Sequence, residues 1–339
     1  MSHVTVNEID PADETLLRQW WEVGAASTAE RPLVGWPAWE VSRTALPMPR
    51  RDLGRTLLVA ELDGRVVGAG LLVRFLLDNT HLAELDVQVL PDHRRHGVGG
   101  ALLRALEDRA VADGRTTLVG TAYAPLEGDS AGSLFAAARG YPVASREETK
   151  ACDLATAPGL WPALDEQVTA GLGGYRVELF EATLPERWVD DFCHLMGRFA
   201  DEIPSGDLDV QDFEWTADRL REHEERMVAI GKVWFGALGV TPDGRACGFT
   251  ELAVTIADPG HAEVGGTLVL PEHRGHRLGL GMKLASHRRL LELFPDCAYV
   301  ETSNAGVNAP MNAVNEALGY RVVERCLDVQ KVLERVAAR

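Results

Sequence analysis

The sequence contains an internal repeat with a nearly constant offset. Asp63-Gly64-Arg65 recurs as Asp243-Gly244-Arg245, 180 positions later. A second cluster recurs at the same offset, in which Pro91, His93, Arg94, His96 and Gly99 correspond to Pro271, His273, Arg274, His276 and Gly279. Gly140-Tyr141 then recurs as Gly319-Tyr320, at an offset of 179. A repeat of this length indicates two copies of one fold and disfavours the alternative of one large α/β domain.

The length of the chain agrees with two domains. Its 339 residues suit two units, taking roughly 100–200 residues as the usual size of a domain. We place the N-terminal domain at residues 1–154 and the C-terminal domain at residues 175–339. Residues 155–174, which are rich in Ala, Gly and Pro, are interpreted as the linker.

Both copies predict the same order of secondary structure, of the α/β (α+β) class. In the first copy, residues 57–75 form two apolar runs around Asp63-Gly64, a dipeptide typical of a two-residue hairpin turn. A third strand over residues 82–90 ends before a proline, and residues 94–114 have the apolar spacing of an amphipathic helix. Each copy begins with a strand and helical material, and closes with a strand and a short helix ending in Gly-Tyr.

Charge and composition restrict the possible functions. The net charge of −17 argues against nucleic-acid binding, because phosphate recognition needs a clustered basic surface. The five cysteines show no disulfide or metal spacing, which predicts buried thiols and no metal site. No apolar stretch is long enough to span a membrane, and the N-terminus lacks the regions of a signal peptide. We therefore expect a cytoplasmic protein without a membrane partner.

A glycine-containing turn carries the strongest chemical signal. A strand stops at Pro91, and Arg94-x-x-Gly97-x-Gly99 then opens a helix. Unpaired amides and the helix dipole attract anions there, glycine permits close approach, and arginine adds charge-assisted hydrogen bonds. We predict a pyrophosphate site in each copy. Its candidate residues are Arg94, Arg95, His96, Gly97, Val98, Gly99 and Gly100 in the first copy, and Arg274, Gly275, His276, Arg277, Leu278 and Gly279 in the second.

The order strand, V-x-x-x-x-R-x-x-G-x-G and amphipathic helix resembles the acyl-CoA-binding motif of the GNAT acetyltransferase superfamily. The resemblance covers almost the whole chain, twice, and implies two tandem GNAT folds, each a mixed, mostly antiparallel twisted sheet flanked by helices. It implies acetyl-CoA (CoA) as cofactor and a third strand that splays from its neighbour after Val89 or Val269. Val87, Val89, Leu268 and Val269 would then run beside the cofactor. In architecture, the tandem arrangement resembles mycothiol synthase, an actinobacterial enzyme with two GNAT domains.

The second copy departs from the motif at Arg277, which stands where the first copy has Gly97. If φ is positive at this position, an arginine there costs about 1 kcal/mol, whereas a helical φ costs little. The departure weakens the prediction of CoA binding in the second copy. Arg277 could instead add a positive charge toward a CoA phosphate.

Asparagines recur in the C-terminal segment of the second copy. Asn304, Asn308, Met311 and Asn315 are spaced by three or four residues, which places them on one face of a helix beginning near Asn308. The resemblance suggests that this face lines the cofactor. The alternative is a structural role as helix caps, for which Asn304 and Asn308 are suited.

Acyl transfer to an amine needs a base for the amine, stabilisation of an oxyanion and protonation of the leaving thiolate. Some family members place a catalytic Glu six residues before the motif Val, which favours Glu263, with Glu251 on the preceding strand as the second candidate. By counting, the equivalent residue of the first copy is Ala83. Solvated strand carboxylates remain the alternative. The Tyr that usually acts as acid is Ala136 or Asn315 here, so water, Tyr123 or Tyr320 would have to replace it.

The sequence therefore predicts an acetyl-CoA-dependent N-acetyltransferase that acts on a small-molecule primary amine by direct attack. We expect one active and one degenerate domain, in a monomer or homodimer. The alternative is a CoA-binding regulatory or scaffold protein in which both sites have lost turnover, as the missing Tyr would permit.

Overall fold

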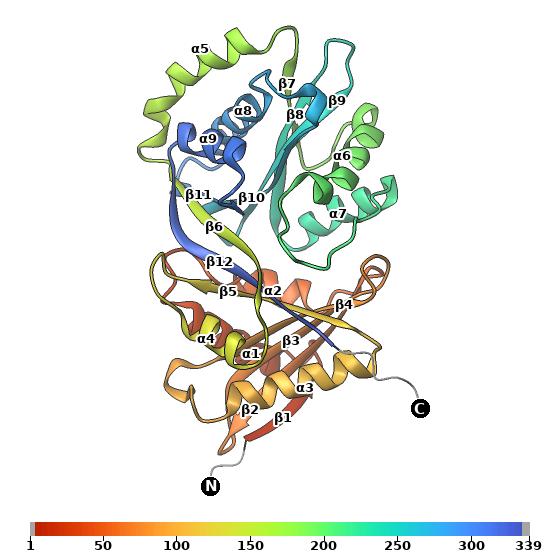
Figure 1. Ribbon diagram of the computed structural model, residues 1–339, viewed down its shortest axis with the longest axis vertical. Helices are drawn as coiled ribbons and strands as arrows, with labels where there is room; N and C mark the ends of the chain where they lie inside the picture. The colour runs from red at the N-terminus through yellow and green to blue at the C-terminus, as the bar shows by residue number, and fades with distance from the viewer. Residues whose placement is uncertain (1–3, 334–339) are drawn as a thin grey trace. The chain divides into compact units, whose positions relative to one another are not determined.

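The computed structural model describes residues 4–333, which form two compact units (Figure 1). Unit 1 contains residues 4–145, Gly206–Gln211 and residues 327–333, and unit 2 contains Arg146–Ser205 and Asp212–Cys326. These limits differ from the expected domain boundaries, because the last strand of each repeat is divided between the two units. β6 (Val143–Asp153) enters unit 2 at Arg146, and β12 (Tyr320–Val332) enters unit 1 at Leu327.

The other elements repeat the order expected from the sequence. In the first repeat they are β1 (Val4–Ile9), α1 (Glu14–Thr28), α2 (Trp39–Ala45), β2 (Leu53–Leu62), β3 (Arg65–Phe75), β4 (Leu82–Val89), η1 (Pro91–His93), α3 (Val98–Ala112), β5 (Thr117–Ala124) and α4 (Ala131–Ala138). In the second repeat they are η2 (Ala157–Leu160), α5 (Trp161–Gly171), β7 (Arg176–Glu181), η3 (Glu186–Trp188), α6 (Val189–Glu202), α7 (Ala217–Ala229), β8 (Lys232–Val240), β9 (Ala246–Thr255), β10 (Asp258–Val269), η4 (Pro271–His273), α8 (Leu278–Leu293), β11 (Tyr299–Ala305) and α9 (Ala309–Leu318).

Each unit has a mixed sheet. The strand order is β1-β2-β3-β4-β5-β12-β6 in unit 1 and β12-β6-β11-β10-β9-β8-β7 in unit 2. β4 pairs with β5, and β10 pairs with β11, in parallel. The pairs β1–β2, β2–β3, β3–β4, β7–β8, β8–β9, β9–β10 and β6–β11 are antiparallel. The predicted fold class is therefore confirmed.

The local signals of the sequence act as expected. Asp63 and Gly64 both have positive φ, of 53° and 79°, as a two-residue turn between β2 and β3 requires. Gly114 and Gly319 follow α3 and α9 with φ values of 75° and 93°, which ends each helix.

Residues 155–174 are not a free linker. η2 and α5 lie within this stretch, and α5 packs along α8. Trp161 and Leu164 are each 5% exposed and belong to the main apolar core of unit 2. Their burial fixes the segment, although its Ala, Gly and Pro content is typical of a linker.

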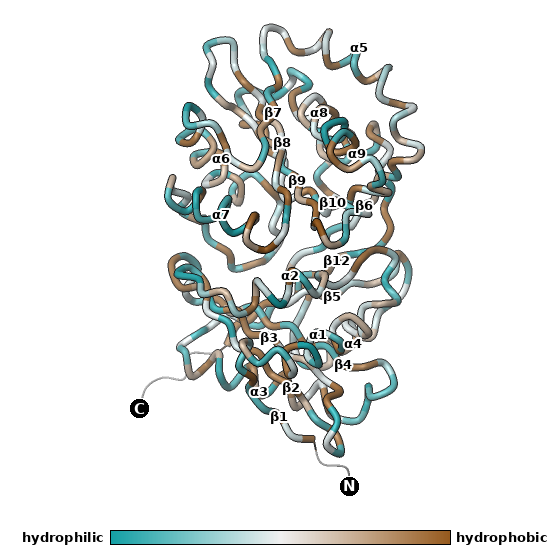
Figure 2. Tube along the Cα trace, turned by 180° about the vertical axis from the view of Figure 1, so that it is seen from behind, coloured by the Kyte–Doolittle hydropathy of each residue, from teal (hydrophilic) through white to brown (hydrophobic). Residues whose placement is uncertain are grey.

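Helices cover both faces of each sheet. In unit 2, α6 and α7 lie on one face and α8 on the other, as Figure 1 shows. In unit 1, α1 and α3 pack against β3 from separate apolar clusters. The core strands are largely apolar, whereas α7 is mostly hydrophilic, apart from its C-terminal end (Figure 2). Trp20 is 3% exposed and packs in the apolar cluster beneath α1.

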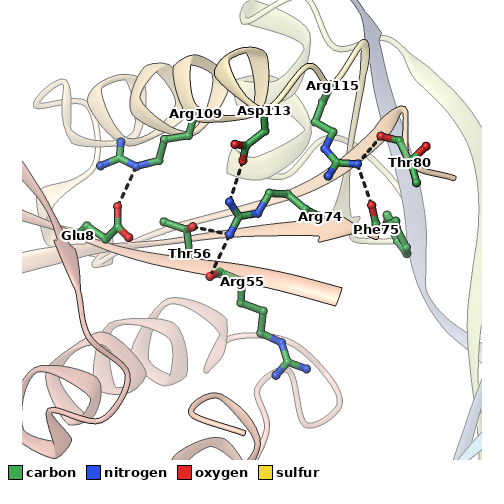
Figure 3. A network of polar contacts seen from close by, with 9 residues as sticks. All are labelled: Glu8, Arg55, Thr56, Arg74, Phe75, Thr80, Arg109, Asp113 and Arg115. Atoms are coloured by element: carbon green, nitrogen blue, oxygen red, sulfur yellow. Dashed lines mark hydrogen bonds and ion pairs between the residues drawn. The ribbon is translucent and has the colours of Figure 1, made fainter. Parts of the chain in front are cut away.

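A polar network fixes the C-terminal end of α3 to the sheet of unit 1 (Figure 3). Arg74 pairs with Asp113 at 2.7 Å and also donates to the oxygens of Arg55 and Thr56. Arg115 donates to the Phe75 carbonyl at 2.7 Å and to the Thr80 carbonyl, and Arg109 pairs with Glu8 at 3.3 Å. These contacts fasten the C-terminal end of α3 to the sheet.

Two further expectations concern the whole chain. Within residues 4–333, no helix is long and apolar enough to cross a membrane. All five cysteines are free thiols with buried side chains, as predicted.

Candidate active site

The glycine-containing turns present a row of unpaired amides at the start of α3 and α8. In α3, Gly97 is the N-cap with φ of 87° and no side-chain cap, and the first bond into the helix runs from Ala101 N to Gly97 O. In the described part of the chain, the N–H groups of Val98 and Gly99 therefore have no acceptor. α8 begins in the same way. Such a turn fits a pyrophosphate, because these amides and the helix dipole point at one place.

The motif arginines are used differently from the prediction. Arg94 Nε donates to the Val89 carbonyl at 3.3 Å, and its Nη2 donates to the Ser27 carbonyl at 3.1 Å. Arg274 Nε donates to the Val269 carbonyl at 3.0 Å, and its Nη2 pairs with Glu202 at 2.7 Å. Both guanidinium groups thus join the turn to the end of the preceding strand. This geometry favours a role in positioning the amides over direct contact with phosphate.

Arg277 takes the strained conformation that its glycine counterpart takes freely. It is the N-cap of α8 with φ of 55°, so the cost considered for a positive φ applies. Its aliphatic stem lies against Gly171 at the end of α5, where an added Cβ would come within 2.5 Å of Arg277 Cγ. Beside it, the Tyr175 ring lies 4.3 Å from the His276 ring, and Tyr175 Oη lies 3.0 Å from His273 Nδ1. The histidines of this turn therefore have packing partners, consistent with a positional role.

The two turns differ in the space beside their last glycine. A Cβ added to Gly99 would meet the Phe135 ring at 3.4 Å, whereas nothing lies within 4 Å of a Cβ added to Gly279. A side chain at position 279 would therefore project into open space at the start of α8. Gly279 is consequently the better position for testing anion binding without disturbing the packing.

We expect Gly279→Glu to weaken acetyl-CoA binding to unit 2 at least tenfold, because a carboxylate would occupy the space where an anion meets the amides. Titration calorimetry with acetyl-CoA measures this effect. The matched control is Gly159→Glu, since Gly159 also has open space around its Cβ and lies outside the turn. Unchanged affinity and stoichiometry in Gly279→Glu would contradict a pyrophosphate site at α8.

The third strand of each repeat separates from its parallel neighbour. Pairing between β4 and β5 stops at Glu84 and Val119, and pairing between β10 and β11 stops at Glu263 and Glu301. The resemblance implied that the strands separate after Val89 and Val269. In the structure the separation begins well before these residues. In unit 1, Gly120 is required at its edge, because a Cβ there would lie 2.9 Å from the Leu85 carbonyl.

Strand alternation decides which backbone groups face this opening. Leu90 N bonds to Val67 O, and Leu270 N bonds to Cys247 O. Backbone groups alternate between the two sides of a strand, so those of Val87, Val89 and Val269 point into the opening. The backbone groups of Leu268 face β9 instead of the opening. Thr267, which the sequence analysis missed, takes its place.

A β-bulge brings two carboxylates of unit 2 to the same face. The pairing of β9 with β10 shifts by one residue between Val264 and Gly266, so Gly265 is the extra residue. Glu263 then lies opposite Ala253, on the face that Glu251 and Trp234 share. The Gly265-Gly266 pair inside a strand was the sequence signal for this bulge.

The same bulge changes the equivalence between the repeats. β4 pairs with β3 without a register shift, and Glu84 lies opposite Val73. Counting pairs back from Val89 and Val269 makes Glu84, not Ala83, the structural counterpart of Glu263.

Glu251 and Glu263 have different environments. Trp234 Nε1 donates to Glu251 Oε2 at 2.8 Å, and burial raises the pKa of Glu251 to about 6. Its other oxygen would lie 2.8 Å from a Cβ at Gly265, so the missing side chain leaves room for the carboxylate. Glu263 is 47% exposed and pairs with Lys232 at 3.0 Å. A carboxylate with a pKa near 6 and one free oxygen is better suited to take a proton.

The asparagines of the second repeat form a closed network. Asn315 is fully buried, and its Oδ1 accepts from Lys283 Nζ at 2.6 Å. Asn304 Oδ1 accepts from Asn315 Nδ2 and from Lys150 Nζ, each at 3.0 Å. Asn304 Nδ2 donates to Asn312 Oδ1 at 2.7 Å. Asn304 lies on β11 (Tyr299–Ala305), so it is neither on the predicted helix face nor a helix cap. Its amide is satisfied within the protein, which favours a structural role.

The remaining predicted residues of this face are Asn308 and Met311. Asn308 is the N-cap of α9, where its side chain accepts from Met311 N at 3.3 Å. Both side chains are half-buried. A role for them beside a cofactor stays a prediction.

The candidate acids also separate. Tyr320 is 4% exposed, and its hydroxyl lies 2.7 Å from His287 Nε2. Tyr123 is 37% exposed, with the Arg31 guanidinium 3.3 Å from its ring centre. Asn315 occupies the position of the usual acid but is fully buried. Of the two candidate tyrosines, Tyr123 is the accessible one.

Comparisons with known proteins agree with this geometry. Residues 20–141 match the model of the acetyltransferase (GNAT) family. A tandem GNAT protein from the clavulanic acid biosynthesis pathway, solved without acetyl-CoA, is 26% identical; the match covers 99% of this chain and 100% of that chain with a TM-score of 0.80. Residues 20–141 carry a GNAT domain, and the chain as a whole has the fold of a tandem GNAT protein.

Other solved structures share the GNAT fold at lower identity. A GCN5-related N-acetyltransferase from Sphaerobacter thermophilus is 17% identical over 99% of this chain and 98% of that chain, with a TM-score of 0.65. A glucosamine N-acetyltransferase region of a fungal multi-domain β-N-acetylglucosaminidase is 12% identical over 97% of this chain and 38% of that chain, with a TM-score of 0.67. No curated protein matches the sequence.

Proposed function

We propose that this protein transfers an acetyl group from acetyl-CoA to the primary amine of a small molecule by direct attack. The observation that carries the proposal is the arrangement in unit 2 of unpaired amides at α8, an opened strand pair and a half-buried carboxylate on the adjoining face. When bound, acetyl-CoA supplies the acyl thioester. The amides at the start of α8 would hold its pyrophosphate.

Glu251 is the proposed base of unit 2. With a pKa of about 6, it is mostly ionised at pH 7 and accepts a proton from an alkylammonium group, which makes the amine nucleophilic. Trp234 fixes one carboxylate oxygen and leaves the other available. Glu263, the base expected from the resemblance, lies on the same face and pairs with Lys232, so we assign it a supporting electrostatic role.

Backbone amides that face the opening, at Val269 and Thr267, are suited to stabilise an oxyanion. Fixed N–H donors stabilise developing negative charge without rearranging. Arg274 donates to the Val269 carbonyl and so holds the end of β10 that carries these amides.

A small molecule is the preferred acceptor class. The net charge of −17 favours a cationic or neutral acceptor over nucleic acid. The similar tandem GNAT protein comes from a small-molecule biosynthesis pathway, which supports the same class.

The direct test is thiol release from acetyl-CoA in the presence of small primary amines, including a diamine, an amino alcohol and an amino sugar. We expect release with at least one amine to exceed the rate without amine by a factor of about 10² or more. If acetyl-CoA binds but no amine accelerates release, the alternative of a CoA-binding regulatory or scaffold protein replaces this proposal.

A further inference from the structure

Unit 1 has a carboxylate in the strand-paired position that corresponds to the Gly266–Glu251 pair of unit 2. Three pairs before the end of β4, Asp86 lies opposite Leu71. Three pairs before the end of β10, Gly266 lies opposite Glu251. The third strand supplies this carboxylate in unit 1 and the second strand supplies it in unit 2. Matching the repeats residue by residue therefore does not reveal it.

Asp86 is held by a series of hydrogen bonds that starts at the glycine-containing turn. Arg94 Nη2 donates to the Ser27 carbonyl at 3.1 Å, and Ser27 Oγ lies 2.6 Å from Gln88 Oε1. Gln88 Nε2 then donates to Asp86 Oδ1 at 2.6 Å. One oxygen of Asp86 is fixed in this way, as Trp234 fixes one oxygen of Glu251.

The position of Asp86 relative to the strand opening also matches. Pairing of β4 with β5 ends at Glu84, so Asp86 lies within the separated part of β4. One face of β4 carries the side chains of Glu84, Asp86 and Gln88, because alternate residues of a strand share a face. Gln88 contacts Ser27 of α1, so this face is turned to α1. The backbone of Val87 and Val89 faces the opening beside them.

We propose that unit 1 is a second acyl-transfer site, in which Asp86 is the base and Gln88 and Ser27 are positioning residues. This inference rests on the proposed function. The Asp86 carboxylate takes one proton from the alkylammonium, and the C–N bond forms as the thioester C–S bond breaks. The second nitrogen proton passes to the leaving sulfur, and the proton on Asp86 then returns to solvent.

The surroundings of Asp86 suit this role. Burial raises the pKa of Asp86, and the hydrogen bond from Gln88 opposes that rise. Glu84 on the same strand is a further carboxylate near it, and desolvation and the Asp86 charge raise the pKa of Glu84. A cationic amine is favoured beside such a set.

Four proteins test the inference: the unsubstituted chain, Glu251→Gln, Asp86→Asn and the double variant. Thiol release is measured with acetyl-CoA and the best amine of the panel. We expect each single variant to keep part of the rate and the double variant to fall about 10²–10⁴-fold, the usual scale for loss of a general base. If Glu251→Gln alone removes all amine-dependent release, or Asp86→Asn changes nothing in either background, unit 1 is not a second site. If the unsubstituted chain shows no amine-dependent release, the proposed function fails first.

Gln88→Leu in the Glu251→Gln background tests positioning. Without the Gln88 amide, the pKa that limits the acid side of the rate profile should rise, while the KM for acetyl-CoA stays within about twofold. If Gln88→Asn partly restores the original pH–rate profile, the result would support a hydrogen-bonding role for Gln88. An unshifted profile in Gln88→Leu would overturn it, whatever the effect on thermal stability.

Discussion

Replacing Glu251 by glutamine should lower the rate of acetyl transfer in unit 2 by about 10²–10⁴-fold at pH 7, because the substrate ammonium loses its proton acceptor. The measurement is kcat/KM for the amine in an Asp86→Asn background, so that only unit 2 contributes. In the Asp86→Asn protein, which keeps Glu251, the rate should fall as the pH drops below about 6, where Glu251 becomes protonated. Higher pH should partly restore the glutamine variant, because the free amine then exists without a base.

Two further variants locate the effect. Gly265→Ala would place a Cβ 2.8 Å from Glu251 Oε1. Since only the end of a flexible side chain must move, we expect a lower kcat with an unchanged melting temperature. Glu263→Gln is the matched control, because its exposed pair with Lys232 should be worth no more than about 1 kcal/mol. An equal or larger loss in Glu263→Gln would transfer the role of base to Glu263.

The stability of unit 2 should depend on pH through Lys283, which is fully buried. Burial lowers the pKa of Lys283 from 10.5 to about 7. Between pH 7 and 9 the unfolded chain holds a proton on Lys283 that the folded protein lacks, so the free energy of unfolding should rise with pH. Above pH 9 the buried thiols of Cys152, Cys247 and Cys297, whose pKa burial raises from 9.0, oppose this rise. The slope is about 1.4 kcal/mol per pH unit for one proton. Below pH 7 the penalty of the buried charge is fully present, and above pH 10.5 it is absent.

Lys283→Met should remove this slope, as measured by denaturant unfolding at several pH values. The first repeat supports the substitution, since the residue at the same position of α3 is Leu103, which is 6% exposed. The absolute stability will also reflect the unpaired Asn315 oxygen, which costs about 1–3 kcal/mol, so the slope is the diagnostic quantity. His287 does not interfere, because burial lowers its pKa from 6.5 to about 3, a separate pH range. A slope between pH 7 and 9 that persists in Lys283→Met would exclude Lys283 as its source.

The sequence by itself determined the local structure of both repeats. Asp63-Gly64 specifies its turn because both residues tolerate positive φ. Gly97 specifies the start of α3, because a glycine N-cap without a side chain leaves the amides unpaired. Periodicity then predicts the order of elements in each copy, because it depends on neighbours close in sequence. The constant offset predicts two copies, and the resemblance of the turn motif to GNAT acetyltransferases implies the tandem GNAT fold.

Only the tertiary structure decided which chain segments complete each unit and which carboxylates share a site. The polar pattern of β6 does not predict a strand, and its pairing with β11 depends on residues about 150 positions away. The bulge at Gly265 moves Glu263 to the face of Glu251, while the unbroken ladder of β4 puts Glu84 and Asp86 on the corresponding face of unit 1. A one-residue register shift reverses the side-chain direction, and only pairing with a neighbouring strand shows whether it occurs. Tertiary packing also determined the role of Asn315, because its side chain accepts a hydrogen bond from Lys283 on another helix, α8.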